Sequence, residues 1–348
     1  MTPTNRQWIL VSRPQGMPGR DNFELREAPV PEIGDNEILV RNLYLSCDPA
    51  QRSWMARDTY VKKIPLGEVM RSGATAQVVA SRHARFREGD IVSGMFGWQD
   101  YATSDGSGFV PVTRLPANVP IPLCMSVLGL TGLTAYFCML DVCDPQPGDA
   151  VLISGAAGAT GSVAAQLAKI RGARVVGIAG GAEKCRWLTE ELGLDAAIDY
   201  RSESVPQELA ELFPRGINAF FDNVGGELLD AVLPRLAPQA RVGLCGAISI
   251  YNDLEHTPPL HNHTQLLVSR ARLQGFLVTD YAHRFAEAGQ QLGTWVAEGR
   301  LKSQVDIVDG LEHAPEAFRR LFTGENLGKQ LVRVTEPTRL SQEKSHAA

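Results

Sequence analysis

The sequence lacks paired cysteines, an excess of basic residues and a recognisable leader segment, and each absence argues against a class of protein. Its six cysteines are scattered with no C-x-x-C pair, at Cys47, Cys124, Cys138, Cys143, Cys185 and Cys245. This usage favours reduced thiols over a disulfide framework. The net charge of −5 argues against nucleic acid or an anionic membrane as partner. Residues 1–7 hold no basic stretch followed by an apolar core, so we expect no secretory signal and a cytoplasmic location.

Ligands for a catalytic zinc ion are also lacking. Cys47 follows a predicted strand, but Leu66-Gly-Glu68 stands where a zinc dehydrogenase would carry Gly-His-Glu. One thiolate without an imidazole is a poor zinc site, and Ser93–Arg114 contains no cysteine for a structural zinc lobe. His261 and His263 could offer two ligands, but a polar loop is the better interpretation. We therefore expect no metal.

The stretch Leu115–Leu140 has no charged side chain and is long enough to span a bilayer. Three prolines open it, and small or polar residues dilute its apolar character. We expect two short buried helices joined near Thr131-Gly132 instead of a membrane span.

The first third of the chain is rich in short strands separated by Pro-Gly spacers, a pattern typical of a partly closed β-barrel. The expected strands are Trp8–Val11, Phe23–Leu25, Ile38–Leu45, Ala74–Ala80, Ile91–Met95 and Phe109–Val112.

Beyond Asp149 strands alternate with helices, which predicts parallel pairing in a doubly wound α/β sheet. The expected strands are Ala150–Ser154, Arg174–Ala179, Ala196–Asp199, Ile217–Asp222, Ala240–Gly246 and Arg272–Val278, with helices at Thr160–Arg171, Ala182–Leu192 and Tyr281–Glu298. Ile307-Val308 and Leu331–Val334 are late strands expected to return to the first domain. The predicted boundaries are 1–128, 129–300 and 301–340, followed by a frayed tail at 341–348.

The chain is organised around the apolar run Ala150–Gly161, which ends in a cluster of glycines and continues as a helix. Gly155, Gly158 and Gly161 would let a pyrophosphate approach the backbone at the N-terminus of that helix. Ala156 replaces the first glycine of the usual fingerprint. The motif alone therefore leaves open whether this is a dinucleotide site or an ordinary strand–helix turn.

The second strand of this region carries no acidic residue at its end, where an NAD-binding fold places one to bind the ribose hydroxyls. It ends at Gly180-Gly181, and Glu183, Lys184 and Arg186 come next. Cations near the 2′ position favour NADPH over NADH, although a solvated helix start is the alternative.

Two later segments should reach the same edge of the sheet, because carboxyl ends of parallel strands share one edge. Asn223, in Phe221–Gly226, can present an amide there. Tyr251, in Cys245–Asn252, could place its hydroxyl over the nicotinamide, or be a buried structural tyrosine. In a metal-free site such a neutral donor suits conjugate reduction, in which hydride adds to the β-carbon of an enone and charge appears on the carbonyl oxygen.

Several separated motifs, in the same order, are similar to those of the zinc-independent medium-chain dehydrogenase/reductases. The similar branch comprises prostaglandin reductases, plant alkenal double-bond reductases and bacterial NADPH-dependent curcumin reductase. The motifs are Leu45-Ser-Cys-Asp-Pro49, Leu66-Gly-Glu-Val-Met70, Gly129-Leu-Thr-Gly-Leu-Thr-Ala-Tyr136, Ala156-Ala-Gly-Ala-Thr-Gly161, Phe221-Asp-Asn-Val-Gly-Gly226 and Cys245-Gly-Ala-Ile-Ser-Ile-Tyr-Asn252.

This resemblance implies a doubly wound parallel Rossmann sheet inserted into a GroES-like, partly open β-barrel domain, commonly in a homodimer. It places Lys184 on the 2′-phosphate, Tyr200 near the adenosine and Asn326 on the cofactor from the returning segment. The full implied cofactor set is Ala156, Gly158, Ala159, Thr160, Gly161, Gly180, Lys184, Tyr200, Asn223, Cys245, Gly246, Ile248, Ser249, Tyr251, Phe276, Leu277, Val278 and Asn326. Tyr251 takes the catalytic role, and Tyr60 and Tyr251 are assigned to the substrate pocket.

Two positions depart from the family pattern. Ala50-Gln51 stands where many members have Tyr-Met, which puts the shape of the substrate pocket in question, and Thr160 replaces a common valine. The resulting hypothesis is an NADPH-dependent reductase of α,β-unsaturated aldehydes and ketones. A quinone reductase on the same scaffold and a non-catalytic NADPH-binding protein are the alternatives.

Overall fold

The computed structural model describes residues 4–253 and 255–338, which fall into two compact units. The first unit contains the chain up to Ile121, Ile307–Leu321 and the part from Gln330 onward; the second contains Pro122–Asp306 and Phe322–Lys329. Three stretches predicted from the sequence to belong to the first domain, residues 122–128, 301–306 and 322–329, group with the second unit. The tail predicted at 341–348 lies outside the described residues.

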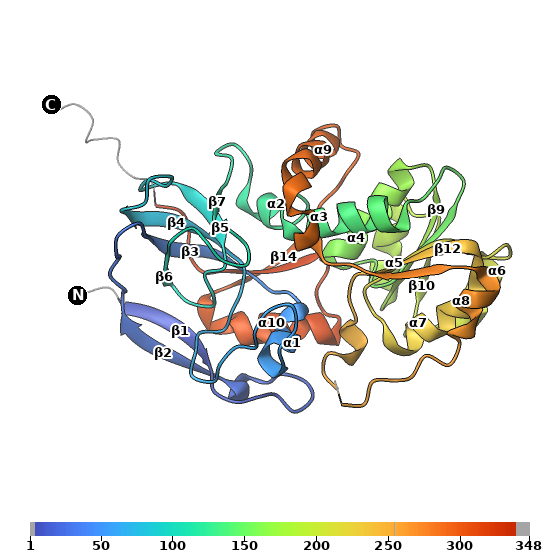
Figure 1. Ribbon diagram of the computed structural model, residues 1–348, viewed down its shortest axis with the longest axis horizontal. Coiled ribbons are helices and arrows are strands. Elements are labelled where there is room, and N and C mark those ends of the chain that lie inside the picture. The colour runs from blue at the N-terminus through green and yellow to red at the C-terminus, as the bar shows by residue number, and fades with distance from the viewer. Residues whose placement is uncertain (1–3, 254, 339–348) are drawn as a thin grey trace. The chain divides into compact units, whose positions relative to one another are not determined.

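The first unit is built mainly from antiparallel strands. Strands β1 and β2 form a hairpin, and a second sheet has the order β14-β15-β3-β4-β5-β7, with β6 paired to β3 (Figure 1). The bounds are β1 Thr4–Leu10, β2 Phe23–Pro29, β3 Ile38–Ser46, β4 Ala74–Ser81, β5 Ile91–Gly94, β6 Tyr101–Ser104, β7 Thr113–Arg114, β14 Val305–Asp309 and β15 Lys329–Arg333, with helices α1 Ala50–Ala56 and α10 Ala314–Thr323.

The strand expected over Phe109–Val112 is wrong, because these residues form a loop between β6 and β7. Gly106 and Gly108 have φ of +79° and +120°, and Val112 N–H donates to Gly106 O to close a turn. Pro111 also lacks the N–H that a strand ladder requires. Apolar content alone was therefore misleading in this segment.

The second unit contains six parallel strands in the order β10-β9-β8-β11-β12-β13. This arrangement confirms the predicted doubly wound sheet. The strands are β8 Ala150–Ile153, β9 Arg174–Ala179, β10 Ala196–Asp199, β11 Ile217–Asp222, β12 Leu236–Leu244 and β13 Arg272–Gly275. The helices are α2 Ile121–Met125, α3 Leu130–Phe137, α4 Ala159–Ile170, α5 Ala182–Arg186, α6 Val205–Leu212, α7 Gly226–Val232, α8 Thr264–Ser269 and α9 Phe285–Ala297.

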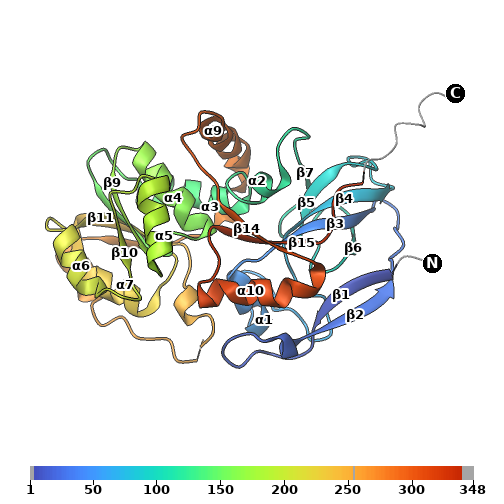
Figure 2. The ribbon, with the colours of Figure 1, turned by 180° about the vertical axis from the view of Figure 1, so that it is seen from behind.

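Alternate residues of the strands supply two separate cores, one on each face of the sheet. In β8, Val151 and Ile153 belong to the core that includes residues of α3, α4 and α9, whereas Leu152 belongs to the core formed with α6 and α7. Figure 2 shows α4 and α5 lying across one face of the sheet. The six strands therefore present all their carboxyl ends at one edge, with helices covering both faces.

Helices α2 and α3 join at residues 126–129, so the predicted junction near Thr131-Gly132 is wrong. Gly129 caps α3 in an extended conformation. Gly132 lies in the first turn of α3, where a Cβ would be 1.8 Å from Val127 O. Gly132 thus marks a close backbone approach and not a break. Within residues 4–253 and 255–338, no helix combines the length and the apolar character needed to cross a membrane.

Replacing Gly132 by alanine should destabilise the protein by about 1–3 kcal/mol, because the new methyl group would overlap the Val127 carbonyl. Gly289→Ala is the matched control, since Gly289 lies inside α9 with nothing within 4 Å of its added Cβ. That change should be neutral or stabilising, by up to about 1 kcal/mol. Thermal unfolding followed by circular dichroism compares the two variants, and equal shifts in Tm would contradict the packing argument.

Candidate cofactor-binding and active site

The glycine-rich turn between β8 and α4 is closely packed backbone. Gly155 has a φ of +58°, and a Cβ on Gly161 would lie 2.3 Å from Gly155 O. Ala156, which replaces the first glycine of the fingerprint, is fully buried and packs against Gly177 of β9, where a Cβ would lie 2.8 Å from its methyl group. The missing side chain at Gly177 thus accommodates the extra methyl group at Ala156.

The start of α4 directs backbone N–H groups toward this turn. Gly158 caps the helix, and Ser162 N–H donates to Gly158 O. The preceding N–H groups, of Ala159, Thr160 and Gly161, lie in the first turn, where helices offer donors to anions. The returning segment Phe322–Lys329 packs on the same turn, since Gly328 N–H donates to Ala157 O at 2.9 Å.

At the carboxyl end of β9 the structure brings together Gly180, Lys184 and Tyr200, three of the residues predicted to bind the cofactor. A Cβ on Gly180 would lie 2.8 Å from the Tyr200 ring, and the side chain of Lys184 donates from Nζ to Gly324 O at 2.8 Å. The Lys184 ammonium is therefore held beside the returning segment at this end of the edge.

A carboxylate that sequence reasoning missed also lies at the end of β9. Asp199 ends β10, and its Oδ1 accepts the N–H of Gly181 at 2.7 Å and that of Arg201 at 3.0 Å, while Ser202 Oγ donates to Oδ2. These bonds, the one from Gly181 first, lower the pKa of Asp199 below its usual value. β9 itself ends without an acid, but the neighbouring strand β10 supplies one whose carboxylate accepts backbone N–H groups.

The edge beyond β11 is organised by a fully buried carboxylate, Asp222. Its Oδ1 accepts the Ser154 hydroxyl at 2.6 Å and the Val224 N–H at 3.0 Å, and both oxygens accept the Gly225 N–H at 3.1 Å. Burial raises the pKa of Asp222, against the opposite effect of these hydrogen bonds. The carboxyl group is thus satisfied entirely by the ends of β8 and β11.

Ser154 and Asp222 also position Asn223 and the loop after β12. Ser154 Oγ accepts Asn223 N–H at 2.8 Å, and Asn223 Nδ2 donates to Ser154 O at 2.7 Å. The N–H groups of Cys245 and Gly246 donate to Asp222 O. The Asn223 amide and the Cys245–Tyr251 loop are consequently fixed to each other through backbone.

Three further residues of that loop are held in the same way. Ile248 N–H donates to Asn223 O, and both the N–H and the hydroxyl of Ser249 donate to Val224 O. The phenol oxygen of Tyr251 accepts the N–H of Ala247 at 3.1 Å.

The remaining predicted residues come from β13, from the returning segment and from the first unit. β13 ends at Gly275, so the expected strand to Val278 is too long, and Phe276 packs on Tyr281 with ring centroids 5.3 Å apart. Leu277 precedes Val278, where a short 3-10 helix begins. Asn326 is buried and donates from Nδ2 to Gly328 O. Tyr60 lies in the first unit, 49% exposed and stacked on Phe109.

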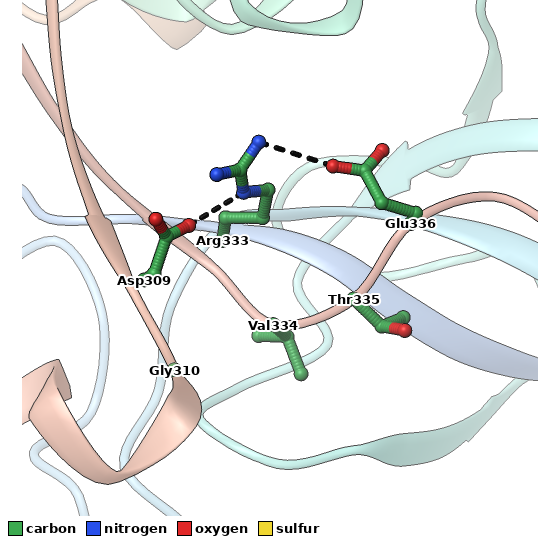
Figure 3. A pocket seen from close by; sticks show the side chains of 6 residues that line it. All are labelled: Asp309, Gly310, Arg333, Val334, Thr335 and Glu336. Atoms are coloured by element: carbon green, nitrogen blue, oxygen red, sulfur yellow. Dashed lines mark hydrogen bonds and ion pairs between the residues drawn. The ribbon is translucent and has the colours of Figure 1, made fainter.

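Two hollows of the structure contain no predicted site residue. One, of about 350 Å³ in the first unit, is lined by Asp309, Gly310, Arg333, Val334, Thr335 and Glu336 (Figure 3). Its Arg333 is held by ion pairs to Asp309 and Glu336. The other lies in the second unit beside Asp230 and Asn262. Within the described residues, no three His, Cys, Asp or Glu side chains gather in a way that could hold a metal ion.

A nucleotide-dependent oxidoreductase is the class that this fold and this sheet edge define, and comparison with known proteins agrees. A family described as the N-terminal domain of oxidoreductase matches residues 6–112, and one described as zinc-binding dehydrogenase matches residues 159–293. The chain is 42% identical to NADPH-dependent curcumin reductase of Escherichia coli (strain K12), over 95% of this chain and 97% of that protein.

Two further relatives are similar over nearly the whole length. The NADP(+)-dependent 2-alkenal reductase of Nicotiana tabacum is 38% identical, over 95% of this chain and 98% of that protein. The crystal structure of CurA from Vibrio vulnificus in complex with NADPH is 39% identical, with a TM-score of 0.90 over 95% of this chain and 100% of that one. The chain belongs to the prostaglandin, alkenal and curcumin reductase branch of the medium-chain dehydrogenase/reductases, as the motifs indicated.

Asp222→Asn should lower the free energy of unfolding by about 1–3 kcal/mol, because the amide NH₂ would face the Gly225 N–H and leave a buried donor unsatisfied. Glu227→Gln, an exposed isosteric change in α7, is the control and should have little effect. Urea denaturation measures both variants. An unchanged midpoint for Asp222→Asn would show that the carboxylate does not brace this edge.

Proposed function

We propose that this protein is an NADPH-dependent reductase of the activated C=C bond of α,β-unsaturated aldehydes and ketones. The observation that carries the proposal is the fixed sheet edge from Lys184 to Tyr251. It occurs in a chain that matches, over nearly its whole length, relatives named for NADPH-dependent reduction of curcumin and of 2-alkenals.

The residues at this edge fit NADPH. Gly158 and Gly161 keep the turn free of side chains, and a Cβ at Gly161 would strike Gly155 O. The first turn of α4 offers N–H donors to a pyrophosphate. Lys184 offers a cation to a 2′-phosphate, beside the Tyr200 ring that lies over Gly180. At the other end, the Asn223 amide and the Cys245–Tyr251 loop would lie along the nicotinamide.

When bound, NADPH supplies the hydride for the β-carbon of the substrate. The chain's own contribution is to orient the carbonyl oxygen and to stabilise the negative charge that develops there. Tyr251 suits that role, because its oxygen is held by the Ala247 N–H and a phenol O–H is a neutral donor to a carbonyl oxygen. Tyr60, an exposed aromatic residue of the first unit, is proposed as a second contact for the substrate.

Tyr251→Phe should reduce the turnover of an enone about 10²-fold or more, since loss of one donor to a developing oxyanion has that order of effect. NADPH binding, measured by fluorescence titration, should remain nearly unchanged. NADPH oxidation is followed at its absorbance band with enals, enones and quinones. Oxidation by quinones alone would favour a quinone reductase, and binding without oxidation would favour a non-catalytic protein. Unchanged turnover would remove Tyr251 from the mechanism.

We further propose that the protein forms a homodimer and is cytoplasmic. Strand β13 is the last strand of the six-stranded sheet, so its outer edge has backbone groups available for another strand. Just before it, Leu267 and Val268 of α8 are 82% and 66% exposed. A second copy of the chain would cover this apolar patch. No disulfide joins the six cysteines, all of which lie among the described residues, and this supports a reducing compartment.

The double change Leu267→Glu and Val268→Glu should weaken self-association, because two carboxylates would be buried in the proposed interface. Leu66→Glu, at an exposed leucine of the first unit, is the matched control. Sedimentation velocity at micromolar concentration measures the outcome. A monomeric wild-type protein, or a dimer unaffected by the double change, would overturn this interface.

A further inference from the structure

Arg201 follows Tyr200 directly after β10 and reaches the end of β9 with its guanidinium group. A Cβ on Gly180 would lie 2.9 Å from Arg201 Nε and 2.8 Å from the Tyr200 ring. Gly180 is therefore bordered by an aromatic ring and by a cation. Because Gly180 has no side chain, the Tyr200 ring and the Arg201 guanidinium can both lie against its backbone.

Lys184 and Arg201 converge on neighbouring carbonyl oxygens of the returning segment. Lys184 Nζ donates to Gly324 O and Arg201 Nη2 donates to Thr323 O, each at 2.8 Å. Gly324 has a φ of +71°, and a Cβ there would lie 2.9 Å from Arg201 Nη2. Two cations thus meet at one point of the sheet edge, and both belong to the second unit.

Carboxylates lie at this point of the sheet edge, so one cation is not enough there to bind a dianionic phosphate. Asp199, whose pKa is lowered, contributes a negative charge beside Gly181. Glu203, whose Oε2 accepts the Asp199 N–H at 2.7 Å, adds a second carboxylate, so Lys184 alone does not balance the two. Arg201 supplies a second cation, which also helps to lower the pKa of Asp199, and its guanidinium donates to a neutral carbonyl that a ligand oxygen can replace.

We infer that Arg201 is a specificity-determining residue that binds the 2′-phosphate of the cofactor together with Lys184. This inference rests on the proposed NADPH-dependent function. A guanidinium presents several N–H donors in a planar fork that matches phosphate oxygens. Its present partner, Thr323 O, is a single neutral acceptor that a phosphate oxygen can replace at the exposed end of the side chain.

The test compares binding of 2′,5′-ADP and 5′-AMP, two probes that differ only in the 2′-phosphate, to the full-length protein by isothermal titration calorimetry. Arg201→Gln should weaken the binding of 2′,5′-ADP by roughly tenfold or more, because a charge-assisted hydrogen bond is lost. The affinity for 5′-AMP should change little. Arg201→Lys should restore part of the affinity. Arg215→Gln is the control, because Arg215 is exposed and precedes β11 at the opposite edge of the sheet.

The remaining outcomes separate this inference from the function on which it rests. If Arg201→Gln weakens the binding of both probes equally, Arg201 only holds the returning segment in place, and the inference is wrong. If Arg201→Gln keeps the preference for 2′,5′-ADP while Lys184→Ala loses it, Lys184 acts alone, and the NADPH-dependent function stands. If the wild-type protein does not prefer 2′,5′-ADP, both proposals fail. Should Arg201→Gln not fold, Arg201→Lys gives the same comparison with a smaller shift.

Discussion

Burial of the Asp222 carboxylate is the constraint on which this sheet edge depends. A carboxyl group with no solvent access is costly unless its oxygens are satisfied, and here a hydroxyl and two backbone N–H groups satisfy them. Those partners lie at the ends of β8 and β11, and one of them, Ser154, also binds the Asn223 N–H. The backbone carbonyl of Asp222 accepts the N–H groups of Cys245 and Gly246. One residue therefore sets the positions of three segments that a nicotinamide would meet.

The opposite end of the edge is set by the returning segment. Phe322–Lys329 bonds to the glycine turn through Gly328 and to the cations through the carbonyls of Thr323 and Gly324. Backbone groups are well suited to this task, because they present the same donors and acceptors whatever side chains they carry. At this end of the edge, two side-chain cations thus donate to backbone carbonyls of the returning segment.

Much of this arrangement could be predicted from the sequence, because strongly periodic segments and turn glycines are local signals. The bounds of β9, β10 and β11 agree with those expected, and the doubly wound order follows from alternation of strands and helices. The helix junction near Gly132 could not be predicted, since a glycine that marks close packing looks the same in sequence as one that ends a helix. The loop at Phe109–Val112 was mistaken for a strand because its apolar residues hide the effect of Gly106, Gly108 and Pro111.

Arg201 and Asp199 were missed for a different reason. Their proximity to Gly180 and Gly181 arises from the pairing of β10 with β9, which is a property of the sheet and not of either strand. The signal was nevertheless present, since Tyr200 had already been assigned to the adenosine end and Arg201 is its neighbour. The roles of Tyr251 and of Tyr60 stay predictions, because sequence similarity assigns them and the structure gives only their surroundings.

The returning segment makes the second unit discontinuous in sequence. Lys184 and Gly324 are 140 residues apart, and Phe322–Lys329 is connected at both ends to residues of the first unit. A hybrid that exchanged only the continuous block Pro122–Asp306 for that of a relative would join one protein's cations to another protein's carbonyls. If Lys184 and Arg201 bind the 2′-phosphate as proposed, cofactor preference depends on two separate stretches of this sequence, and recombination preserves it only when both are transferred together.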